Sequence, residues 1–154
     1  MSAPDNRPLV PDWLVAPEDA NGLVPSVWPE SACRDESGAL SIGGVSVKEL
    51  KEQFGTPLYV LDEPGVRARA RRVREAFDAA TARHGVRARV YYAGKAFLST
   101  EVVRWVTSEG LAVDVATGGE LAIALAGGAD PSRIGLHGNN KSTAELDAAV
   151  AHGL

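Results

Sequence analysis

The sequence has few of the residues that cross-link small domains through disulfides or metal ions. Its 154 residues include one cysteine, Cys33, so no disulfide can form within the chain. The three histidines, His84, His137 and His152, lack the short spacing of zinc ligands. We therefore expect no metal site and a protein of a reducing compartment.

Excess basic charge and long apolar runs are also missing. Lys and Arg number 16 against 20 Asp and Glu, for a net charge of -4, which argues against a surface that follows nucleic-acid phosphates. Arginines concentrated between Arg67 and Arg89 flank an apolar stripe and are interleaved with Glu75 and Asp78, which favours a solvated helix face over a nucleic-acid groove. No stretch approaches the length of a membrane span, and residues 1–11 lack the basic and then apolar pattern of a signal peptide. We expect a cytoplasmic protein without nucleic-acid or membrane partners.

Proline separates the chain into two parts. Seven of the nine prolines precede residue 60, and proline breaks long helices. Within this part, residues 40–45 predict two short strands around a Gly-Gly turn, and residues 46–54 predict a short helix with Ser46 as its cap. Residues 56–61 then predict a further strand.

Beyond Asp62, helical and β-rich segments alternate. A long amphipathic helix follows Asp62, and the later strand centres are spaced by about 22 residues, a rhythm typical of βαβ units with a parallel sheet. Such a sheet is either open or closed into a barrel. The predicted strands are 89–93, 111–115 and 133–137.

Polar residues lie at the carboxyl end of each of these three strands, where parallel sheets collect functional groups. Lys95, Asp114 and His137 hold these positions, and small neighbours leave room for a flat ligand. A lysine there suits Schiff-base chemistry, once its amine is activated. From spacing alone, the structural interpretations are favoured: a lysine extending to solvent, a carboxylate that caps the following helix or pairs with an arginine, and a hydrogen-bonded histidine.

Two loops lie at the predicted helix starts beside these residues. Gly118, Gly119 and Glu120 form one, which is a weak candidate for anion binding; close packing, with Glu120 complementing the helix dipole, is the favoured interpretation. The other loop contains Asn139 and Lys141 and leads into a capping box whose two residues are Ser142 and Glu145.

Four segments resemble, in order and spacing, the amino-terminal part of bacterial diaminopimelate decarboxylases. That family belongs to the fold-type III pyridoxal-phosphate decarboxylases, together with ornithine and biosynthetic arginine decarboxylases. The segments are TPLYVLDE at 56–63, YYAGKAF at 91–97, DVATGGEL at 114–121 and LHGNNKS at 136–142.

The resemblance implies an α/β fold and a pyridoxal-phosphate site. Residues 63–154 would be the first βα units of a TIM-like (β/α)8 barrel, and residues 1–62 an extension that contributes to a β domain. Lys95 would bind the cofactor covalently and move protons, and Asp114 and His137 would contact the cofactor. Three further residues would support the site from behind, namely Glu120, Asn139 and Lys141.

The resemblance also implies an activity, which is decarboxylation of meso-2,6-diaminopimelate to L-lysine and CO2 by a homodimer. One alternative is a relative that acts on ornithine or arginine. Another is a non-catalytic, truncated product. Because the barrel ordinarily takes about 250 residues, we expect the chain to be an amino-terminal portion that is inactive alone.

Overall fold

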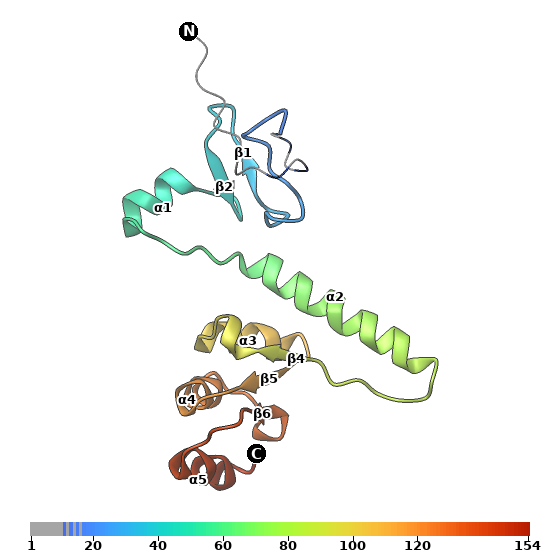
Figure 1. Ribbon diagram of the computed structural model, residues 1–154. Coiled ribbons are helices and arrows are strands. Elements are labelled where there is room, and N and C mark those ends of the chain that lie inside the picture. Colours follow the sequence, from blue (N-terminus) through green and yellow to red (C-terminus); the bar gives the residue numbers. More distant parts are fainter. Residues whose placement is uncertain (1–10, 12, 14, 16) are drawn as a thin grey trace.

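The computed structural model describes residues 11, 13, 15 and 17–154 and contains two small sheets connected by a long helix (Figure 1). In chain order, the strands and helices are β1 (Cys33–Arg34), β2 (Leu40–Ile42), β3 (Val45–Ser46), α1 (Val47–Phe54), α2 (Glu63–Ala82), β4 (Tyr91–Ala93), η1 (Gly94–Ala96), α3 (Thr100–Ser108), β5 (Ala112–Val115), α4 (Gly118–Ala126), η2 (Pro131–Arg133), β6 (Ile134–Leu136) and α5 (Thr143–His152).

The first sheet is antiparallel, in the order β1-β2-β3. The turn between β2 and β3 uses Gly43 and Gly44, both at positive φ, a backbone region that glycine enters without steric cost. Helix α1 follows at once, and its cap Ser46 accepts a hydrogen bond from the backbone N–H of Lys48 at 3.2 Å. The two strands, the glycine turn and the Ser46 cap are confirmed.

The strand predicted for residues 56–61 is wrong. The segment connects α1 to α2 without secondary structure, and the side chain of Tyr59 is 97% exposed. A β-rich sequence forms a strand only when a second strand pairs with it. Residues 56–61 pair with no strand of the described part. Asp62 precedes α2 as expected, but its carboxylate accepts from Ser31 Oγ at 2.7 Å and does not cap the helix.

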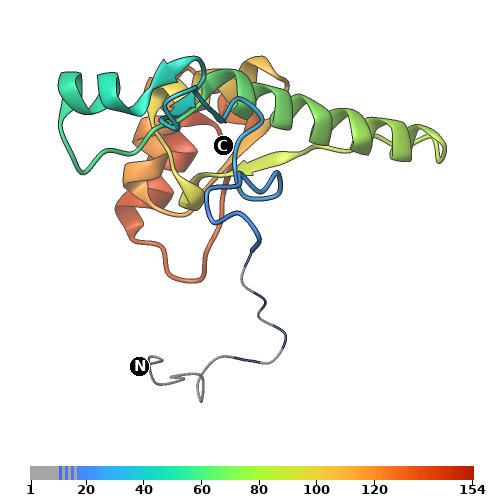
Figure 2. The same cartoon turned by 90° about the horizontal axis from the view of Figure 1, so that it is seen from above.

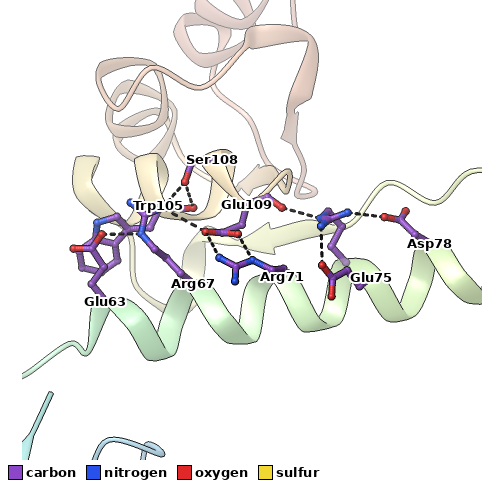
Figure 3. A network of polar contacts seen from close by, with 9 residues as sticks. Glu63, Arg67, Arg71, Glu75, Asp78, Trp105, Ser108 and Glu109 are labelled. Carbon is purple, nitrogen blue, oxygen red and sulfur yellow. Dashed lines mark hydrogen bonds and ion pairs between the residues drawn. The ribbon is translucent and has the colours of Figure 1, made fainter.

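Helix α2 lies across α3 and continues past the second sheet, as both ribbon views show (Figures 1 and 2). Its arginines form ion pairs with acidic residues. Arg71 makes two hydrogen bonds to the Glu109 carboxylate, at 2.9 and 3.0 Å, and Arg67 lies 3.6 Å from the same group (Figure 3). These hydrogen bonds, first of all those from Arg71, lower the pKa of Glu109. The predicted solvated helix face is therefore in part a contact with Glu109 at the end of α3.

The second sheet is parallel, in the order β4-β5-β6, as the strand spacing predicts. Helices α3, α4 and α5 stack on one side of it (Figure 1). Val113 and Val115 of β5 are fully buried on that side. They pack with residues of the two nearest helices, and burying each such side chain stabilises the fold by roughly 1.5–3 kcal/mol. The helical members of this core are Val102, Val103, Val106, Leu121 and Ala124, together with Ala70 of α2.

The three strands form an open sheet, so the described residues contain βα units and no closed barrel. None of the helices in the described ranges is long and apolar enough to cross a membrane.

Candidate functional site

The side of the parallel sheet opposite the three helices is the candidate site, and we call it the open face. Side chains alternate along a strand, so Asp114 lies on the face opposite to its buried neighbours in β5. The strand register places it between Ala93 of β4 and Gly135 of β6. A Cβ at Gly135 would lie 3.4 Å from the Tyr91 ring and 3.5 Å from Asp114 Oδ1. The open face therefore has small residues around one carboxylate.

Lys95 follows β4 within the short 3-10 helix η1, and its side chain is exposed. The preceding residue, Gly94, is buried so tightly that a Cβ there would lie 2.9 Å from the carbonyl oxygen of Asp114. On the other side of the turn, the Tyr92 hydroxyl donates to the carbonyl of Phe97 at 2.6 Å. Burial raises the pKa of Tyr92. The backbone that carries Lys95 is thus held against β5, and its side chain is exposed.

Asp114 and His137 contact each other directly. Asp114 Oδ1 lies 2.6 Å from His137 Nδ1, with the two side chains 25% and 60% exposed. The backbone N–H of His137 donates to the carbonyl of Val115 at 2.9 Å, which extends the β5–β6 ladder to the residue after β6. The ladder therefore fixes the histidine backbone, and the carboxylate fixes its ring.

Several backbone N–H groups at the amino terminus of α4 already have partners. Glu120 accepts from the N–H of Ala116 at 2.6 Å, and the cap Thr117 accepts from the N–H of Glu120 at 3.2 Å. Glu145 of α5 accepts from the N–H of Gly118 at 2.7 Å. Charge complementarity at the helix start is the interpretation that the structure bears out for Glu120, because carboxylates occupy the positions that an anion would need.

The next loop is tied to the same turn. Lys141 donates from Nζ to the carbonyl of Ala116 at 2.8 Å. The capping box is confirmed, since Ser142 and Glu145 exchange both of its hydrogen bonds. The N–H of Ser142, followed by that of Gly118, lowers the pKa of Glu145. Asn139 is exposed at the tip of the loop.

The structure brings Lys95, Asp114 and His137 to the carboxyl end of the parallel sheet, but they do not occupy paired positions on adjacent strands. Asp114 pairs with Ala93, and Lys95 and His137 both lie beyond the ends of their strands. Sequence reasoning missed Gly135, whose bare backbone leaves space beside Asp114. The signal was available, because counting back two residues from His137 gives the strand position on the same face.

Comparison with known proteins shows the family to which the chain belongs. The family described as "Pyridoxal-dependent decarboxylase, pyridoxal binding domain" matches residues 65–154. This match covers more than half of the chain, and the chain belongs to that family.

Named relatives agree with the assignment. Diaminopimelate decarboxylase of Mycobacterium tuberculosis is 50% identical over 132 residues, which are 86% of this chain and 28% of the relative. A crystal structure of diaminopimelate decarboxylase from M. jannaschii in co-complex with L-lysine has a TM-score of 0.74 at 31% identity, covering 80% of this chain and 28% of that one. A lysine/ornithine decarboxylase from Vibrio vulnificus, complexed with cadaverine, has a TM-score of 0.58 at 27% identity, over 70% and 27% of the two chains. The chain thus spans about 28% of the length of the curated relative that it matches.

Proposed function

We propose that these residues supply the cofactor lysine and part of the cofactor pocket of a diaminopimelate decarboxylase. The whole protein would convert meso-2,6-diaminopimelate to L-lysine and CO2 with pyridoxal 5'-phosphate. The observation that carries the proposal is the exposed Lys95 beside the small-residue face around Asp114. Family membership and the 50% identity to a diaminopimelate decarboxylase support the same activity.

The residues present fit the aldehyde end of the cofactor. The Lys95 amine is accessible, and the space over Gly135 that a Cβ would fill is bordered by Tyr91 and Asp114. A flat ring needs such an uncrowded surface. The starts of α4 and α5 do not suit its phosphate, because Glu120 and Glu145 already accept from the N–H groups there. We therefore place the ring, and not the phosphate, on this edge of the sheet.

Each of the predicted site residues has a role in this proposal. Pyridoxal phosphate, when bound, supplies the electron sink that decarboxylation requires. Lys95 holds the cofactor through its Nζ and moves a proton at that atom. Asp114 contacts the cofactor from β5, and His137 contacts it from the position after β6. Behind them, Glu120 and Lys141 fix the turn after β5 through the backbone of Ala116, and Asn139 belongs to the same supporting loop.

We extend the proposal to the organisation of the whole protein. Residues 63–154 form the first βα units of a TIM-like barrel, and residues 1–62 are an extension that contributes to a β domain. The change from an antiparallel to a parallel sheet on the two sides of this boundary supports it. A homodimer in the cytoplasm is proposed on the family resemblance alone.

An activity on ornithine or arginine is the second candidate, and the likeness to the lysine/ornithine decarboxylase favours it. Diaminopimelate is preferred because the M. jannaschii structure is more similar, with a TM-score of 0.74 against 0.58.

The test is to supply the whole protein with pyridoxal phosphate and each amino acid in turn. We expect CO2 and L-lysine from meso-2,6-diaminopimelate. Faster CO2 release from ornithine or arginine would replace the preferred substrate with the second candidate. Absence of cofactor-dependent CO2 release from all three would refute the proposed function.

A further inference from the structure

The hydrogen bond between Asp114 and His137 determines where the histidine carries its proton. Asp114 Oδ1 lies 2.6 Å from His137 Nδ1. An ionised carboxylate can only accept a hydrogen bond, so Nδ1 must be the donor. In the neutral ring the lone pair is then on Nε2. Among the described residues, none forms a hydrogen bond with Nε2, and the side chain is 60% exposed.

Two charged groups at the turn after β5 are engaged elsewhere. Lys141 donates from Nζ to the carbonyl of Ala116, and Glu120 accepts from the N–H of the same residue. Neither competes for the carboxylate of Asp114. With a neutral ring, the Asp114–His137 pair carries one negative charge on a face lined by small residues. A cationic N–H donor complements both that charge and the lone pair on Nε2.

We propose that Asp114 is a positioning residue that holds His137 with its proton on Nδ1, so that Nε2 accepts a hydrogen bond from the side-chain amine of a bound diamino acid. The identity of that ligand rests on the proposed function. The proton position on the ring does not, because it follows from the contact between the two side chains.

The proton position can be read from the nitrogen chemical shifts of the histidine rings in the chain at about pH 8, where ordinary histidines are neutral. We expect a proton on Nδ1 of His137 and none on Nε2. Asp114→Asn should shift part or most of the population to the form protonated on Nε2. Asp130→Asn is the matched control, because the Asp130 carboxylate bonds to Ser132 and not to a histidine.

A wild-type spectrum with the proton on Nε2 of His137 would overturn the inference by itself. The inference therefore stays testable even if the Asp114→Asn variant does not fold. An unchanged spectrum in a folded Asp114→Asn variant would overturn it as well.

The ligand is tested in the whole protein with L-lysine and with L-norleucine, which has the same carbon chain without the side-chain amine. We expect L-lysine to move the Nε2 shift of His137 and L-norleucine to leave it in place; equal shifts would contradict recognition of the amine. The two proposals fail separately. A wrong proton position with lysine formation intact contradicts only the role of Asp114. The expected proton position without lysine formation contradicts only the proposed function.

Discussion

The two faces of the parallel sheet are made by the same three strands but differ in composition and in exposure. On the helix side, Val113 and Val115 are fully buried among residues of α3 and α4. On the open face, the residue between them is Asp114, with Ala93 and Gly135 beside it. One face thus holds the strands in place, and the other presents polar groups from a surface that the core keeps rigid.

This difference teaches that stability and chemistry are separable here at the level of single residues. A side chain on the helix side has many apolar neighbours, so its loss leaves a cavity. A side chain on the open face contacts few other residues. Its loss therefore removes function with little change in the free energy of unfolding.

Lys95→Met is expected to give the largest effect on activity and almost none on stability. Its amine is proposed to hold the cofactor and to move a proton, and proton transfer alone contributes about 10²-fold or more to rate. We expect kcat of the whole protein to fall by at least that factor, with an unchanged urea midpoint. Lys51→Met, an exposed lysine of α1, is the matched control. A variant that keeps its activity would remove Lys95 from the mechanism.

Leu121→Ala is expected to give the largest loss of stability. Leu121 is 2% exposed in the core between α4 and the sheet, and such truncations cost about 2–5 kcal/mol. Urea unfolding of the chain measures it. Leu146→Ala is the matched control on α5, where the side chain is 50% exposed, and it should change the free energy of unfolding by less than about 0.5 kcal/mol. Equal losses in the two variants would show that the helix side is not the stabilising face.

Asp114→Asn should cost far less stability than Leu121→Ala. It weakens one hydrogen bond to a largely exposed histidine, and a bond of that kind contributes about 0.5–1.5 kcal/mol. The same urea titration compares the two. A loss as large as that of Leu121→Ala would contradict the separation of the two faces.

Glu145→Gln is expected to give the smallest effect, one that depends on pH. Backbone N–H groups lower the pKa of Glu145 in the folded chain, so its carboxylate stabilises the fold above the ordinary glutamate pKa, about 4.3. That contribution is lost as the pH falls through the lowered value. The wild type should therefore exceed the variant in Tm near pH 7, and the difference should shrink in acid. Glu52→Gln on the exposed side of α1 is the control; a difference that grows in acid would be the wrong sign.

Local signals predicted most of the parallel sheet. The alternation of strands and helices gave β4, β5 and β6, because each strand carries its own apolar residues and each helix its own caps, as Ser142 and Glu145 show. Segment 56–61 was predicted wrongly, since a strand depends on a neighbour that the pattern does not reveal. Asp62 likewise found a partner, Ser31, far away in sequence.

The site was predictable as a set of positions but not as a set of contacts. Strand ends located Lys95, Asp114 and His137, because strand length and register depend on local sequence. The hydrogen bond from the Gly118 N–H to Glu145 and the one from Lys141 to the Ala116 carbonyl join segments that are more than 20 residues apart, so no local pattern specifies them. Such contacts arise from packing between units.

The most direct test of the open face as the chemical face is to reduce the whole protein with borohydride in the presence of pyridoxal phosphate and to map the labelled peptide. We expect the pyridoxyl group on Lys95. The chain offers three other lysines for comparison, namely Lys48, Lys51 and Lys141. A label on any of these in place of Lys95 would contradict it.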